Sequence, residues 1–252
     1  MLVFVVGLLL VLVAVLVFVV LSTRRRRRGA GESAPQRRNR LITLVGAAAA
    51  ALLGVLLVGG SSVYAQDTGD ASVIVSWTGD ILGQEIAPGL HVKAPWSTVK
   101  TFSVRNQQVV FTGDQGSTNY TGGSANGPQI TVQDSDGVTS DIDIAVRYSI
   151  RPDQVTTIYK QFRDETNFVS QFVTQDIRST VRDAPNSFST LDLITKRADV
   201  NTAIQEALTK RWDGTGVTVD SVSLQQITPP KSVTAAYAAA QNAQIKLSLI
   251  HI

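Results

Sequence analysis

Residues 141–150, Asp-Ile-Asp-Ile-Ala-Val-Arg-Tyr-Ser-Ile, decide the fold of this chain. Apolar side chains alternate with polar or small ones over the whole stretch, which is the period-two pattern of a β-strand with one face in solvent. Asp134, Asp136 and Gly137 precede the strand and resemble the start of a calcium loop, but the later oxygen ligands and the terminal Glu are missing at the required spacing. We therefore interpret them as an Asp-Gly hairpin turn, and the carboxylates within the strand as its solvent face.

The periodicity becomes helical after this strand, from Pro152 onward. Thr228-Pro229-Pro230 closes a later strand, and an Ala- and Gln-rich segment follows it. We expect helices over 155–162, 168–181 and 200–212, a strand over 217–227 and a final helix over 233–246.

Short strands are predicted upstream as well, at 73–77, 90–92, 99–104 and 107–112. The segment 113–128 separates them from the alternating strand, and its five Gly and lack of aliphatic residues indicate a flexible loop. The pattern as a whole predicts an α/β (α+β) domain with a mixed or antiparallel sheet and packed helices.

Two long apolar segments precede this domain. Leu2 to Leu21 has no polar side chain, and its twenty residues reach about 30 Å as a helix, which is one hydrocarbon core. Leu41 to Val58 is less apolar but long enough to cross. Its Gly46, Ala50 and Gly54 recur every four residues, so they share a helix face where a second helix could approach closely.

The basic charge of the chain is confined to the segment between the two spans. The net charge is +3, but residues 22–40 carry eight Arg and one acid, so the rest of the chain is acidic, at −4. Because no aromatic residues are interleaved with the Arg, we expect no nucleic-acid partner. The topology-determining residues are Arg24, Arg25, Arg26, Arg27, Arg28, Arg37, Arg38 and Arg40.

Short loops rich in Arg stay in the cytoplasm, so this loop predicts that Gln66 onward lies outside the cell. We expect a multi-pass protein of a plasma membrane, in a bacterium, with an extracytoplasmic domain and the lipid bilayer as partner. The alternative is that 37–65 is an internal signal peptide cleaved after Ala65, which would release the domain.

The search for catalytic chemistry yields little. The chain has no Cys and two His, which excludes thiolate metal sites and disulfides and leaves little for a histidine metal centre. Ser97 and Lys100 form an S-x-x-K pattern that could belong to an exported hydrolase, but the companion motifs are absent. His91 is interpreted as a hydrogen-bonded structural residue. We expect no enzyme activity, no cofactor and no metal.

The order of elements and several strings resemble the SPFH (band 7) superfamily, which includes stomatin, prohibitin, flotillin and the HflK/HflC proteins. The resemblance runs from about 69 to 244. The matching strings contain Pro88, Gly89, Leu90, His91, Pro95, Asp136, Gly137 and Pro229, with Asp176-Ile177-Arg178 and Gly216-Val217-Thr218-Val219. It implies a non-enzymatic membrane scaffold that assembles into homo- or hetero-oligomers and organises membrane microdomains or regulates membrane proteins. A narrower form is an HflK/HflC-like regulator of a membrane protease.

The resemblance also suggests a division of the chain and leaves the client protein open. Relatives continue the last helix into a coiled coil, so we expect the C-terminus to be truncated. The expected segments are spans at 1–21 and 41–60, an Arg-rich loop at 22–40, a linker at 61–70, a strand-rich subdomain at 71–150, a second subdomain at 151–230 and the start of a long helix at 231–252.

Overall fold

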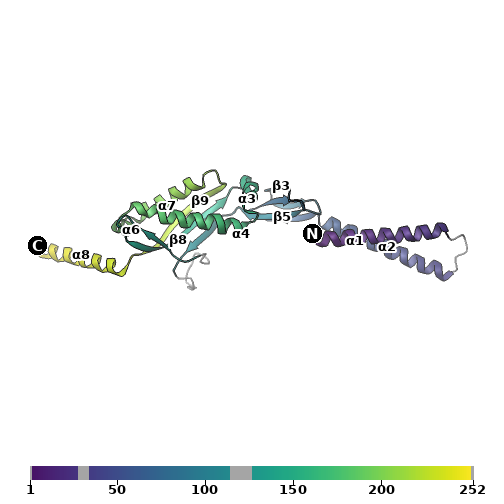
Figure 1. The fold of residues 1–252 in the computed structure, drawn as a ribbon, viewed down its shortest axis with the longest axis horizontal. Helices are drawn as coiled ribbons and strands as arrows, with labels where there is room; N and C mark the ends of the chain where they lie inside the picture. The colour runs from purple at the N-terminus through teal and green to yellow at the C-terminus, as the bar shows by residue number, and fades with distance from the viewer. Residues whose placement is uncertain (1, 28–33, 114–126, 251–252) are drawn as a thin grey trace. The chain divides into compact units, whose positions relative to one another are not determined.

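A computed structural model describes residues 2–27, 34–113 and 127–250 of the chain. It divides into two compact units, one ending at Thr101 and the other beginning at Phe102 (Figure 1).

The first unit begins with an antiparallel pair of helices, α1 (Leu2–Arg27) and α2 (Ala34–Gly60), which lie side by side in Figure 1. They cross closely at Gly7 and Gly54, where a Cβ added to Gly54 would lie 2.8 Å from the Gly7 carbonyl oxygen. Ala14, one heptad after Gly7, is also buried. Of the predicted small-residue face, Gly54 therefore contacts α1, whereas a Cβ at Gly46 would meet no described atom within 4 Å.

The remaining surface of this helix pair is apolar and exposed. Val3–Val20 and Ile42–Gly60 are each long and apolar enough to cross a bilayer. Leu16 is 64% exposed and Val45 is 67% exposed, whereas the core helices of a soluble protein bury such side chains. Lipid is the solvent in which this exposure is favourable.

Two small sheets complete the first unit. The short strands β1 (Val63–Gln66) and β4 (Gly89–Val92) form an antiparallel pair. The three-stranded sheet has the order β3-β2-β5, and its buried residues include Ala71 and Val73. Its strands are β2 (Asp70–Val75), β3 (Ile81–Glu85) and β5 (Thr98–Ser103), of which β2 and β3 pair antiparallel. The sequence did not predict β1 and β3. β1 lies in the expected linker, and it was missed because its partner strand, β4, is far along the chain.

The second unit is built on β8 (Thr139–Ile150), which contains the alternating stretch 141–150. Its partner β9 (Val217–Thr228) runs along almost its full length, while β6 (Gln107–Phe111) and β7 (Ile130–Gln133) share its other edge, all antiparallel. A tight turn joins β7 to β8, which confirms the predicted Asp-Gly hairpin.

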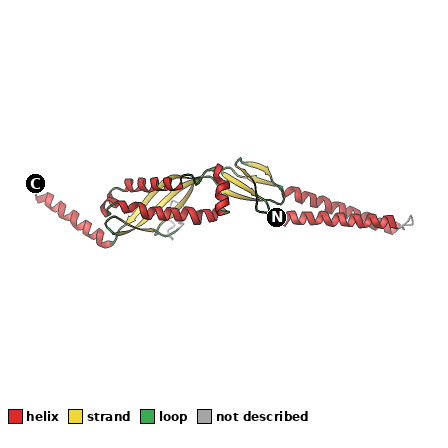
Figure 2. Cartoon of the chain, turned by 45° about the horizontal axis from the view of Figure 1, so that its top comes forward, coloured by secondary structure: helices red, strands yellow, loops and turns green. Residues whose placement is uncertain are grey.

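Helices cover this sheet, with α7 against β9 and α5 against β7 (Figures 1 and 2). A π-helical turn inside the second predicted helix places Phe168 and Val173, five residues apart, both in the core. The three predicted helices are confirmed, and α6 was not predicted. The bounds are η1 (Pro152–Gln154), α3 (Val155–Phe162), α4 (Glu165–Phe168), η2 (Val169–Val173), α5 (Thr174–Asp183), η3 (Ala184–Ser187), α6 (Thr190–Thr195), α7 (Arg197–Trp212) and α8 (Lys231–Ile250).

The core of the second unit is aromatic at its centre. The Tyr148 ring meets the Trp212 ring edge-on with centroids 6.1 Å apart, and Phe172 links Trp212 to Phe168 through further ring contacts. Such pairs add about 0.5–1.5 kcal/mol each beyond the area that they bury. The largest fully buried side chains here include Phe102, Phe111, Ile130, Ile142, Ile144, Ile150, Ile158, Ile177 and Leu193.

One prediction about β8 is wrong. Asp143 was assigned to a solvent face, but it is 8% exposed and accepts hydrogen bonds from the Thr112 hydroxyl (3.2 Å) and the Gly113 amide (3.1 Å). Ala145 is buried as well, so the middle of β8 is covered on both faces. The alternating pattern indicated the strand correctly, but it could not show that the end of β6 folds back to satisfy this carboxylate.

Candidate functional site

No catalytic constellation lies within the described ranges. There is no group of three or more His, Cys, Asp or Glu among those residues that could hold a metal ion. The hydroxyl of Ser97 is buried and donates to the Ala94 carbonyl oxygen at 2.7 Å, and Lys93 Nζ donates to the Ser97 carbonyl oxygen at 2.8 Å. A serine whose proton is held by a main-chain carbonyl is not activated as a nucleophile.

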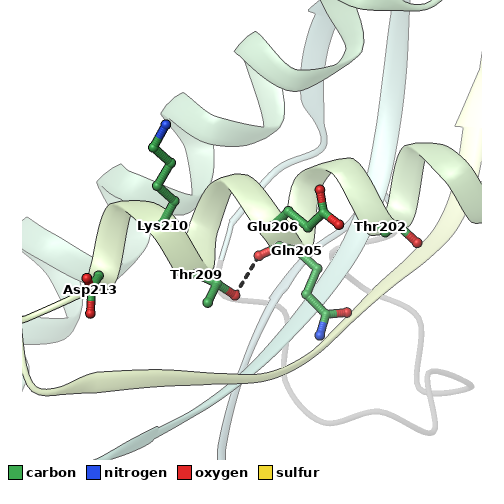
Figure 3. A pocket seen from close by; sticks show the side chains of 6 residues that line it. All are labelled: Thr202, Gln205, Glu206, Thr209, Lys210 and Asp213. Atoms are coloured by element: carbon green, nitrogen blue, oxygen red, sulfur yellow. Dashed lines mark hydrogen bonds between the residues drawn. The ribbon is translucent and has the colours of Figure 1, made fainter.

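The second unit has a groove of about 580 Å³ that is lined by polar and charged residues (Figure 3). All of its lining residues lie on α7 or just after it, and the Thr209 hydroxyl is bonded to the Gln205 carbonyl oxygen at 2.7 Å. Because one helix face supplies the whole lining, the side chains do not converge on a common point as they do in a substrate pocket. The lining residues are Thr202, Gln205, Glu206, Thr209, Lys210 and Asp213.

The most unusual surface is an apolar face in the first unit, close in sequence to the second apolar helix. In the β1–β4 pair, Val63 lies opposite Val92 and Ala65 lies opposite Leu90, so these four side chains share one face of the ladder. Leu90 and Val92 are 78% and 79% exposed. Soluble surfaces rarely present such a continuous apolar face, which marks contact with a partner or a membrane.

Exposed tryptophans add to this apolar surface. Trp77 is 71% exposed, and with Trp96 it lines a hollow of about 350 Å³ that Phe4 and Val5 of α1 complete. The Phe4 and Trp96 rings meet edge-on at 6.3 Å. Tryptophan is enriched at the level of lipid headgroups, where its amphipathic ring is most stable. Further large apolar side chains exposed in this unit are Leu82 and Ile86.

The string Pro88-Gly89-Leu90-His91 forms the end of the β3–β4 loop and the start of β4. Gly89 has φ of 130°, which explains why glycine stands there. The His91 ring points away from the apolar face and contacts Glu85, Ala87 and Tyr64. The interpretation of His91 as a hydrogen-bonded residue is confirmed, and Pro95 lies in the turn before β5.

The other predicted strings stabilise the second unit. Asp136 and Gly137 lie in the β7–β8 turn, where the Asp134 carboxylate accepts from the main-chain amides of Asp136 (3.0 Å) and Val138 (2.9 Å). Thr190, at the start of α6, donates its amide to Asp136 and its hydroxyl to Asp134. Pro229 lies between β9 and α8, where it ends the strand.

Asp176 joins two helices of the same unit. Its carboxylate accepts from the Trp212 indole N–H at 3.1 Å and pairs with the Arg211 guanidinium at 2.8 Å. It therefore connects α5 to the end of α7, and its role is structural.

The Arg cluster lies where α1 ends and α2 begins, whereas β1 follows the other end of α2. Arg24 to Arg27 extend α1, and Arg37, Arg38 and Arg40 lie in the first turns of α2. Arg28 and most of the 113–128 loop lie outside the described residues.

The sequence analysis did not identify the apolar face or the exposed tryptophans as functional. A signal was present, since Leu90 and Val92 flank His91 with the spacing of one strand face, and Trp77 and Trp96 both lie within forty residues of the second apolar helix. Only the structure shows that these side chains are exposed rather than buried in a core.

Comparison with known families identifies the part of the chain that follows the two apolar helices. The family described as SPFH domain / Band 7 family matches residues 66–250. The chain belongs to this family. Comparison with curated proteins found no match. Members of the family generally associate with membranes, oligomerise and lack enzymatic activity.

Proposed function

We propose that this chain is a membrane-anchored, self-associating scaffold that organises membrane microdomains or regulates membrane proteins. The observation that carries the proposal is the exposed apolar surface of the first unit: two helices of spanning length followed by Val63, Leu90 and Val92 on one open β-face. A surface of this kind is stable against lipid and unstable in water.

Self-association is supported by α8. Its described side chains, 231–243 and 245, are nearly all exposed, and Ala236, Ala240 and Ala243 follow Val233 at the three- and four-residue spacing of a coiled-coil seam. Most of the stability of helices in proteins comes from packing against other segments, so packing against a second copy would stabilise this exposed helix.

The assembly test uses the full chain in mild detergent, with mass measured by light scattering. We expect a particle several times the 27.0 kDa of one chain. Ala240→Asp places a charge in the proposed seam and should reduce the mass, whereas Ala238→Asp, on the opposite face of the same helix, should not. A wild-type monomer, or equal effects of the two substitutions, would refute self-association through α8.

We further propose that both apolar helices cross the plasma membrane, with the Arg segment in the cytoplasm and 66–250 outside. Because the chain has no Cys, single cysteines report topology without background. A membrane-impermeant maleimide applied to intact cells should label Ser223→Cys and spare Thr23→Cys. The reverse pattern would overturn the orientation, and neutralising all eight Arg should mix the two patterns.

The narrower proposal is regulation of a membrane protease in the manner of the HflK/HflC proteins. It is favoured by the proposed extracytoplasmic position of the domain beside the membrane. Its test is affinity purification of the full chain from mild detergent, in which a membrane protease should co-purify in stoichiometric amount. Purification without one would count against this form and would leave the scaffold proposal intact. Release of the domain by cleavage after Ala65 would appear as a mature N-terminus at Gln66.

A further inference from the structure

The β1–β4 ladder connects the second apolar helix to the β-strands of the first unit. Only Ser61 and Ser62 separate the end of α2 from β1, and the Lys93 amide at the end of β4 donates to the Ser62 carbonyl oxygen at 2.7 Å. Any movement of α2 therefore reaches β1 first. The stability of the β1–β4 ladder therefore determines how firmly α2 is joined to the strands of the first unit.

His91 lies in the middle of the ladder, with its ring opposite Tyr64, and both ring nitrogens face oxygen acceptors. Nε2 lies 2.7 Å from the Ala87 carbonyl oxygen, and Nδ1 lies 3.4 Å from Glu85 Oε2. The Tyr64 ring packs against the imidazole with centroids 5.6 Å apart. His91 thus links the end of β3, the β3–β4 loop and β1.

The Glu85 carboxylate, which faces Nδ1 of His91, is held in place by main-chain amides. Glu85 Oε1 accepts from the main-chain amides of Ile86 and Ala87, each at 3.2 Å, which turns Oε2 toward the His91 ring. The titratable side chains that face this ring are Glu85, at the end of β3, and Tyr64, on β1. The nearby Lys93 is engaged with the Ser97 carbonyl oxygen instead.

The two contacts of the ring require different numbers of protons. A carbonyl oxygen only accepts, so Nε2 must carry a hydrogen to bond Ala87. In a neutral ring Nδ1 then presents a lone pair to the Glu85 carboxylate, and the two repel. In the imidazolium Nδ1 also carries a hydrogen, so the same geometry becomes an ion pair.

Tyr64 does not compete for this proton. Burial, followed by the negative charge of Glu85, raises the pKa of the Tyr64 hydroxyl, so the phenol stays neutral wherever imidazole changes charge. Tyr64 therefore carries the same charge in both protonation states of His91, and the Glu85 contact is the one that changes.

We propose that His91 is a proton-operated latch, which closes the β3–β4 loop onto β4, the partner strand of β1, when the imidazole is protonated and releases it when the imidazole is neutral. Protonation thereby holds β4 in place beside β1, the strand that follows α2, and fixes the apolar face of Val63, Leu90 and Val92. The latch itself does not depend on the proposed function. Only the effect of the latch on membrane contact rests on the proposed membrane scaffold.

The test is hydrogen exchange of the full chain in detergent at pH 5.5 and pH 7.5, with the intrinsic pH dependence of exchange divided out. We expect peptides covering 61–66 and 86–93 to be protected about two- to fivefold more at the lower pH, the range for a partly exposed ion pair. Peptides covering β6 and β8 serve as the internal reference and should not change.

Substitutions distinguish the latch from other pH effects. His91→Gln and Glu85→Gln should each abolish the pH dependence in 61–66 and 86–93, and Glu85→Gln keeps the imidazole in place if the other variant folds poorly. His251→Gln, which changes the only other histidine, should retain the wild-type behaviour. No pH dependence in the wild type, or its persistence in Glu85→Gln, would overturn the latch. A monomeric chain would instead refute self-association without affecting this result.

Discussion

The close crossing of α1 and α2 allows a matched test of how the helical pair is held together. Gly54 and Gly46 lie two turns apart on the face that the sequence predicted for packing, but the structure gives them different surroundings. A Cβ on Gly54 would lie 2.8 Å from the Gly7 carbonyl oxygen and 2.7 Å from a methyl carbon of Val11. A Cβ on Gly46 would meet no described atom within 4 Å. Gly54→Ala and Gly46→Ala are therefore the same chemical change in two environments.

The two substitutions are expected to change the stability of the helix pair in opposite directions. Ordinary contacts of a Cβ begin near 3.4 Å. Because the Gly7 carbonyl is backbone, Gly54→Ala must push the helices apart by roughly half an ångström, and overpacking of this kind costs about 1–3 kcal/mol. At Gly46 the helix only gains from the replacement of glycine, by up to about 1 kcal/mol. Both variants replace a glycine inside the same helix, so the gain from that replacement cancels in the comparison. They should therefore differ in hairpin stability by the overpacking cost alone, about 1–3 kcal/mol.

The assay uses the absence of cysteine in the chain. Leu16→Cys and Val45→Cys, both on exposed positions of the pair, accept a donor and an acceptor dye, and dodecyl sulfate is titrated into mild detergent until energy transfer is lost. Gly54→Ala should lose transfer at a lower fraction of dodecyl sulfate than the labelled parent, and Gly46→Ala at the same or a higher fraction. Equal midpoints for the two variants would show that the helices do not cross at Gly7 and Gly54.

Three further predictions concern the rest of the chain. Ser97→Ala should leave labelling by a serine-reactive phosphonate unchanged at background, because the hydroxyl is bonded to a carbonyl; labelling of the wild type that the substitution removes would revive the hydrolase interpretation. Asp176→Ala should lower the free energy of unfolding of the second unit by about 1–3 kcal/mol, since it leaves the buried indole N–H of Trp212 without its acceptor, whereas Asp213→Ala on the surface should have little effect in the same denaturant titration. Burial, followed by the Glu165 charge, raises the pKa of Tyr148, so the folded state keeps a proton that the unfolded state loses near pH 10; stability should fall as pH rises above 10, and Tyr148→Phe should flatten that decline in an alkaline unfolding experiment.

Local pattern determined much of this molecule from the sequence. The alternation in 141–150 indicated β8, the helical spacing of apolar residues indicated α3, α5 and α7, and the uninterrupted apolar residues of 2–21 indicated the long apolar helix α1. These features are readable because the side chains that fix each element lie within a few residues of one another. The strings around Gly89 and Gly137 indicated the family for a similar reason, since each records a local turn.

Contacts between distant segments were decided only by the tertiary structure. β1 is four residues long and resembles a linker until β4 supplies its partner, more than twenty residues later. Asp143 has the pattern of a solvent residue, and it is buried because Thr112 and Gly113 return to bond it. The Glu85–His91 contact and the exposure of Trp77 likewise depend on which surfaces meet. Periodicity records which face of an element is apolar, but whether that face meets a core, a lipid or water depends on the packing of segments that lie far apart in the sequence.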